Sequence, residues 1–114
     1  MKYLLGATLL IFSSVSQASW IEASGKVTSL MTYSSTETVL VTLTSEGSPV
    51  EQCSNTTTFA ISKSASEESR SRMFAMLLTA KTAGTTVAVA FNSSGGCEPW
   101  GANPEAYRII KRLR

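Results

Sequence analysis

The chain has 114 residues and carries ten Lys or Arg against eight Glu, with no Asp and no His. A net charge of +2 at pH 7 gives no long-range field to attract nucleic acid or an anionic membrane, so neither is an expected partner. Two cysteines without His or Asp leave a zinc site short of ligands. We therefore expect no metal and no cofactor.

Residues 1–18 have the pattern of a secretory signal peptide. Lys2 precedes an apolar run over residues 3–12, and small residues lead to a predicted cleavage after Ala18. That run is about half the roughly twenty residues that a membrane-spanning helix needs, so an anchor is disfavoured. Residues 19–114 then form one secreted or periplasmic domain. Its nine Lys or Arg against eight Glu leave a net charge of +1.

Cys53 and Cys97 are the only cysteines of the chain. In an oxidising compartment they favour a structural disulfide, which would staple a domain too small to bury more than about two-thirds of its surface. The closed loop of about 45 residues would remove unfolded-state entropy worth about 4 kcal/mol. An intermolecular disulfide or a redox-active thiol is the alternative, but the wide spacing is not that of a redox motif.

Two strands with period-two alternation open the domain. The first covers residues 20–33, with Ile21, Val27, Met31 and Tyr33 on one face, and Gly25 indicates a bulge or bend within it. After a polar break, residues 38–44 alternate valine or leucine with threonine and form the second strand. The two strands are expected to pair as a hairpin.

A third strand over residues 56–62 is followed by a helix signal. Ser64 and Glu67 match a capping box, in which each side chain bonds a free backbone N–H at the helix start. The helix continues through an apolar stripe that ends near Ala80, with Lys81 in its last turn. Gly84 is placed as its left-handed C-cap.

Two further strands complete the expected fold. Residues 87–91 form the fourth, residues 92–103 read as a Gly- and Ser-rich loop, and residues 107–114 form the last. Tyr107, Ile109 and Leu113 of the last strand are expected to face inward. Three strands, one helix and two strands is the order of the OB-fold, a five-stranded Greek-key barrel. The expected class is therefore mainly β with one helix (α+β), as an OB-fold-like barrel.

The residues predict binding rather than catalysis. Without His, no Ser or Thr is identified as an activated nucleophile, and the adjacent Glu67 and Glu68 are explained by the helix N-terminus. We therefore expect no enzyme activity. Trp20 and Trp100 are consistent either with packing or with stacking on a ligand.

The strongest charge cluster is a basic tail made of Arg108, Lys111, Arg112 and Arg114. One interpretation is a contact with single-stranded nucleic acid, since OB-folds often hold strands in basic grooves. The other is an exposed terminal strand whose charges discourage edge pairing. The low net charge favours the second interpretation.

Three local features carry a family resemblance: Ser19 and Trp20 after the predicted cleavage, the run 24–27 (SGKV), and Ala83-Gly84 leading into the fourth strand. In this layout the chain resembles the B subunits of the subtilase cytotoxin and typhoid-toxin type, secreted OB-fold proteins that form pentameric rings and bind sialylated glycans. The resemblance implies that Ser24 contacts the sugar. It also implies a homo-oligomer, a pentamer in that family, and an enzymatic A subunit as a possible partner.

The sequence thus predicts a secreted, non-catalytic module that binds a cell-surface glycan or glycoprotein. The family has tyrosines near the helix end, where this chain has Thr79, Ala80 and Lys81. The alternative prediction is a periplasmic or envelope domain with a structural or protein-interaction role, an OB-fold and no small ligand.

Overall fold

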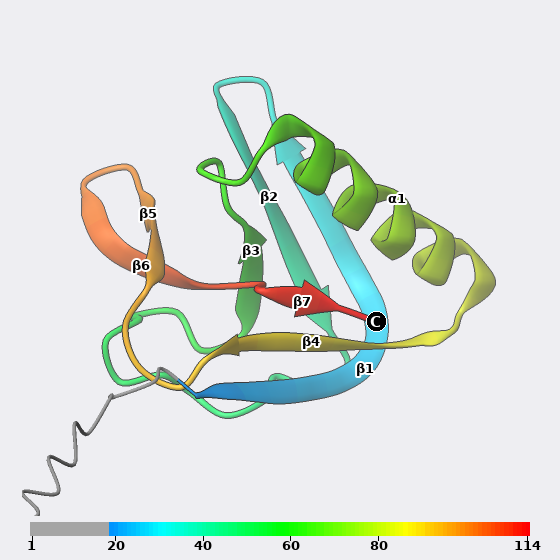
Figure 1. Ribbon diagram of the computed structural model, residues 1–114, viewed down its shortest axis with the longest axis horizontal. Coiled ribbons are helices and arrows are strands. Elements are labelled where there is room, and N and C mark those ends of the chain that lie inside the picture. The colour runs from blue at the N-terminus through cyan, green and yellow to red at the C-terminus, as the bar shows by residue number, and fades with distance from the viewer. Residues whose placement is uncertain (1–18) are drawn as a thin grey trace, which may run out of the picture.

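A computed structural model describes residues 19–114, and the predicted signal peptide at 1–18 lies outside this range. The elements in chain order are β1 (Trp20–Tyr33), β2 (Thr36–Leu43), β3 (Thr58–Ile61), α1 (Glu67–Ala83), β4 (Thr86–Asn92), β5 (Cys97–Trp100), β6 (Asn103–Ile109) and β7 (Arg112–Leu113). The strands form one seven-stranded sheet in the order β5-β6-β3-β2-β1-β4-β7. The helix lies beside the curved β1 (Figure 1). The expected class, mainly β with one helix, is confirmed.

Strand β1 bends, and each half has its own partner. Residues 20–26 pair with β4, whereas residues 27–33 pair with β2. Gly25 is required near the bend, because a Cβ there would lie 2.7 Å from Thr44 Oγ1. A register shift between Val27 and Ser29 moves the alternation by one residue. Consequently Met31 and Tyr33 are exposed whereas Val27 is buried, and the prediction that these residues share one face is wrong.

The core lies between the inward faces of the sheet and one side of the helix. Its largest fully buried apolar side chains are Phe59, Phe91, Ile61, Leu77, Val41 and Val89. The rings of Phe59 and Phe91 pack with their centroids 5.1 Å apart. The helix itself contributes two buried residues, Leu77 and Ala80.

The N-cap of helix α1 lies two residues later in the chain than predicted. Ser66 is the N-cap, and its side chain accepts a hydrogen bond of 3.1 Å from the Ser69 N–H. The predicted cap, Ser64, instead shares a hydrogen bond with Ser62. The helix end is as predicted, because Gly84 has φ 68° and its N–H bonds the Ala80 carbonyl.

The C-terminal part differs most from expectation. The predicted loop at 92–103 contains β5, which forms an antiparallel hairpin with β6. The predicted last strand is two strands, β6 parallel to β3 and β7 antiparallel to β4. Within β6 the inward positions are also shifted, since Ala106 and Arg108 are buried while Tyr107 and Ile109 are only partly so. Arg108, expected on the surface, is 1% exposed.

The Cys53–Cys97 disulfide is confirmed, with the two Cα atoms 5.6 Å apart. It joins the long connection between β2 and β3 to the first residue of β5, so the two ends that it links lie on either side of β3, α1 and β4 in the chain. A disulfide is compatible with an extracytoplasmic protein. Within residues 19–114, no helix has the length and apolar character needed to cross a membrane.

Candidate ligand-binding site

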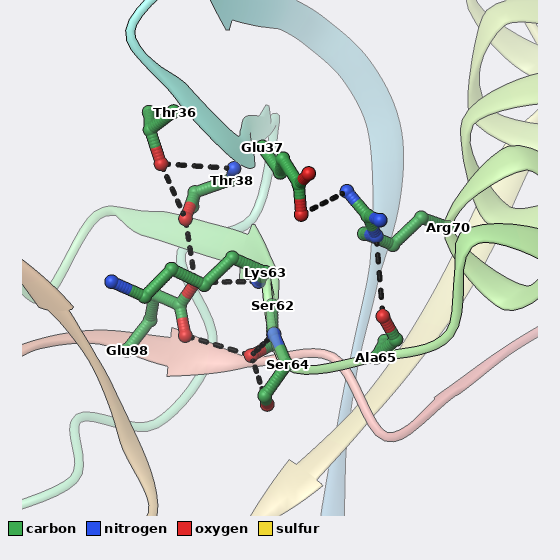
Figure 2. Close-up of polar contacts among 9 residues, drawn as sticks. All are labelled: Thr36, Glu37, Thr38, Ser62, Lys63, Ser64, Ala65, Arg70 and Glu98. Atoms are coloured by element: carbon green, nitrogen blue, oxygen red, sulfur yellow. Dashed lines mark hydrogen bonds and ion pairs between the residues drawn. The ribbon is translucent and has the colours of Figure 1, made fainter.

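A buried carboxylate organises one end of the sheet. Glu98 of β5 is 2% exposed, and its Oε2 accepts hydrogen bonds from Thr38 Oγ1 at 2.6 Å and from the Lys63 backbone N–H at 2.8 Å. Its Oε1 accepts from Ser62 Oγ at 2.8 Å. Figure 2 shows these groups converging on Glu98 from β2 and from the segment after β3. A buried charge requires such partners, because burial without them would be very costly.

The same network continues toward the surface. Thr36 Oγ1 donates to Thr38 Oγ1 at 3.3 Å, so that Thr36 is linked to Glu98 through one intervening hydroxyl. At the start of the helix, Arg70 forms an ion pair with Glu37 of β2 at 3.0 Å (Figure 2). The start of β2, the segment after β3 and strand β5 are therefore held in one fixed arrangement.

A polar pocket of about 370 Å³ opens next to this network. It is lined by Ser35, Thr36, Lys63, Pro99, Trp100 and Gly101. Two of these residues are anchored on Glu98, Lys63 through its backbone and Thr36 through Thr38. The Lys63 side chain is exposed, and among residues 19–114 it has no ion-pair partner. The pocket hence combines hydroxyl groups, one free ammonium group and one indole.

The indole of Trp100 is held by two tyrosines. Its ring centroid lies 5.1 Å from that of Tyr33 and 5.7 Å from that of Tyr107, and both contacts are edge-on. Edge-on pairs of this kind fix ring orientation. Trp100 is only partly buried. It therefore packs against the two tyrosines and also borders the pocket.

This arrangement suits recognition. The described residues hold no group of three His, Cys, Asp or Glu side chains that could bind a metal ion. Both carboxylate oxygens of Glu98 accept hydrogen bonds within the network. What the pocket offers a ligand is hydrogen bonding, a positive charge and an aromatic surface.

Ser24 lies elsewhere, on the exposed outer side of β1 opposite Ala88 of β4. It is not among the residues that line the polar pocket. Its neighbour on the same side of β1, Glu22, forms ion pairs of 3.0 Å with both Arg112 and Arg114. Hydrogen bonds from these two arginines hold the pKa of Glu22 below its ordinary value.

Trp20 stands close to the same ion pairs. It is half-exposed, and the Arg112 guanidinium carbon lies 5.7 Å from its ring centroid. The two tryptophans thus belong to different surfaces, Trp100 to the polar pocket and Trp20 to the outer face of β1.

Arg108 of β6 is buried against the connection between β2 and β3. Its guanidinium donates to the carbonyl oxygens of Glu46, Ser48 and Thr56 at 2.6, 3.0 and 2.9 Å. It also lies 4.0 Å from the ring centroid of Phe59. Desolvation lowers the pKa of Arg108, and the charge of Glu46 partly opposes this effect. Arg108 therefore acts as an internal clip, by which we mean that its guanidinium fastens the β2–β3 connection to β6.

Sequence reasoning missed both buried charges. Glu98 lies in a predicted loop because Gly and Ser precede it, and nothing local indicates that the short segment 97–100 is a strand. For Arg108 a signal exists, since it stands between Ala106 and Ile110 at period two, the spacing of one buried strand face.

The family of unknown function DUF5992 matches residues 1–102. No curated protein matches the chain. The family match covers the predicted leader and every element up to β5, including both cysteines, Glu98 and all the residues that line the polar pocket. The chain belongs to the family DUF5992.

Proposed function

We propose that this protein is a secreted, non-catalytic module that binds carbohydrate in the polar pocket beside Glu98. The observation that carries the proposal is the fixed grouping of Trp100, Lys63 and Thr36 around a hollow of about 370 Å³. Binding sites with a few convergent polar groups and an aromatic wall are typical of small-ligand recognition. Sugars present apolar C–H faces to an indole and hydroxyls to the surrounding polar groups.

An OB-type barrel is the fold that we propose for this module. Only Ile110 and Lys111 separate β6 from β7, and their N–H groups donate to Ala60 of β3 and Ala90 of β4. Taken as one interrupted strand, β6 and β7 would bridge β3 and β4. The pairing would then run β1-β2-β3-(β6, β7)-β4-β1, with the β5–β6 hairpin as an addition.

The position of the pocket supports the same proposal. OB-folds bind oligosaccharides and oligonucleotides over strands 2 and 3 and with the loops that join strands 1 to 2 and 4 to 5. Here the pocket takes Ser35 from the β1–β2 turn, Thr36 from the start of β2, Lys63 from the segment after β3, and residues 99–101 from the segment that follows β4. A net charge of +1 after leader removal argues for an uncharged or singly charged sugar over nucleic acid.

We further propose that the module acts as a homo-oligomer, a pentamer as the toxin resemblance implies. Several shallow sites on one ring would convert weak single-site affinity into firm attachment to a glycan-bearing surface. Light scattering on the mature protein measures the assembly directly. A monomer at micromolar concentration would contradict the ring. Failure to recover an enzymatic A subunit together with the protein would contradict the toxin role.

A glycan array probed with residues 19–114 tests the binding proposal. We expect selective saccharide binding that is lost in Lys63→Ala and in Trp100→Ala. Lys63→Ala is the more informative variant, because only its backbone supports Glu98 and the fold should be unchanged. Trp20→Ala is the matched control, since that tryptophan lies away from the pocket. No binding above background, or equal loss in Trp20→Ala, would refute the pocket.

Ser24→Ala belongs to the same experiment. Ser24 is the sugar contact that the toxin resemblance implies, and its hydroxyl is exposed on β1. Loss of binding in Ser24→Ala with retention in Lys63→Ala would move the site to the outer face of β1. Retention in Ser24→Ala with loss in Lys63→Ala would support the polar pocket.

A further inference from the structure

A second hollow runs between helix α1 and the C-terminal strand, away from the polar pocket. One part, of about 420 Å³, lies between the C-terminal half of the helix and the start of β4, and includes Thr79, Val87 and Arg114. The other, of about 280 Å³, lies between the first half of the helix and β7. Met76 borders both parts, and we call the two adjoining hollows together the α1 groove.

The floor of the α1 groove is apolar. Met73, Met76 and Leu113 line it toward β7, and Ala75, Ala80 and Val87 line it toward β4. Met76 is 45% exposed, although it is a large apolar side chain. The helix residues from Ser69 to Ala80 recur every three or four positions, so one stripe of the helix faces the groove for roughly 16 Å. This is an elongated apolar channel.

The rim of the α1 groove is basic. Arg72, Lys111 and Arg112 border the part next to β7, and Arg114 borders the part next to β4. Within residues 19–114, Arg72 and Lys111 have no ion-pair partner, and Arg112 and Arg114 share one carboxylate, that of Glu22. Glu67 and Glu68 line a neighbouring hollow at the helix start, which Arg72 also borders. Four cations thus border the α1 groove, with Glu22 paired to two of them and Glu67 and Glu68 beside Arg72, although the net charge of residues 19–114 is only +1.

We propose that the α1 groove binds an anionic amphiphile, a single acyl chain that carries a phosphate or carboxylate headgroup. The chain would lie on the Met73, Met76 and Leu113 floor, and the headgroup would be neutralised by Arg72 and Lys111. A neutral apolar ligand would leave these cations unused, and a free inorganic anion would leave the floor unused. The combination of the two features selects a molecule that has both.

Calorimetric titration of the full mature protein with dodecyl phosphate below its micelle concentration tests this. Dodecyl maltoside supplies the same chain without charge, and inorganic phosphate supplies the charge without a chain. We expect dodecyl phosphate to bind at least about ten-fold more tightly than dodecyl maltoside, and inorganic phosphate not to bind measurably. Equal affinity for the two amphiphiles, or binding of phosphate alone, would overturn the proposal.

Two sets of variants locate the ligand. Met76→Glu should abolish binding of dodecyl phosphate, whereas Leu78→Glu should not, because Leu78 is equally exposed at 47% but lies outside the groove. The double variant Arg72→Gln, Lys111→Gln should lower affinity for dodecyl phosphate about ten-fold and leave dodecyl maltoside unchanged. Equal effects of the Met76 and Leu78 variants would overturn the assignment. These results do not depend on whether the polar pocket binds saccharide.

Discussion

Replacing Arg108 by methionine tests whether a buried charge holds the β2–β3 connection in place. Methionine has a similar length and no charge, so Arg108→Met removes the three bonds to the carbonyls of Glu46, Ser48 and Thr56 with little loss of volume. The contact between the guanidinium and the Phe59 ring, 4.0 Å from the centroid, is lost as well.

The magnitude follows from which groups are left without partners. Hydrogen bonds to a charged group contribute about 1.5–3 kcal/mol each, but the three carbonyls belong to exposed residues and water can replace the donor, so about 1 kcal/mol each is appropriate. The cation–π contact adds about 1 kcal/mol. Part of this is offset because the desolvated guanidinium, whose Nε has no partner, is removed. We expect a net loss of about 3 kcal/mol in the free energy of unfolding.

Urea denaturation followed by tryptophan fluorescence measures this loss for Arg108→Met and for the control Arg108→Lys. Lysine keeps the charge but cannot reach all three carbonyls, so its loss should be smaller. Limited proteolysis should cut Arg108→Met within residues 45–57 before any other segment. A stability within about 0.5 kcal/mol of wild type would refute the reasoning, since it would show that apolar packing replaces the clip at no cost.

Three further predictions concern the Cys53–Cys97 disulfide, the buried carboxylate of Glu98 and the stability of the protein at low pH. Replacing Cys53 and Cys97 by serine should lower the free energy of unfolding by about 4 kcal/mol in urea titrations. As a control, a reductant should not change the stability of this variant. Glu98→Ala should cost about 3 kcal/mol or more and abolish saccharide binding, whereas Glu98→Gln should cost much less, because the Ser62 hydroxyl can rotate and accept from the new amide. The pKa of Glu22 is lowered in the folded state, so its ion pairs stabilise the protein above its ordinary pKa of 4.5 and are lost as the pH falls. Thermal melting of Glu22→Gln should accordingly show a weaker decline below pH 4.5 than wild type.

The sequence was sufficient where local chemistry decides the structure. Period-two alternation located β1, β2 and β4, and Gly84 marked the helix end because only glycine adopts its left-handed conformation without strain. The disulfide followed from having two cysteines and a predicted leader. The strands and the helix end depend on residues that are neighbours in the chain, and the disulfide had only one possible intramolecular pairing.

Features that depend on distant partners were not predictable in this way. The alternation changes phase at Ile110 and Lys111 because their N–H groups bond two different strands, β3 and β4, and no residue type announces that change. Strand β5 has four residues and exists through its pairing with β6 and through the bonds that Glu98 receives from Thr38 and Ser62. The polar pocket was not predictable either, since its lining residues come from three separate segments of the chain.

The basic tail shows how the fold redistributes a charge cluster. In the sequence its four cations are a single feature, but Arg108 is buried as a clip, Arg112 and Arg114 are tied to Glu22, and only Lys111 is left without an ion-pair partner in the part of the chain that the structure describes. A nucleic-acid interface would need these cations side by side and accessible. The free positive charge instead meets other elements, Lys111 with Arg72 at the α1 groove and Lys63 with Trp100 at the polar pocket. A cation beside an apolar or aromatic surface can orient a small anionic group at each place, which is why we propose small or single-chain ligands for both hollows.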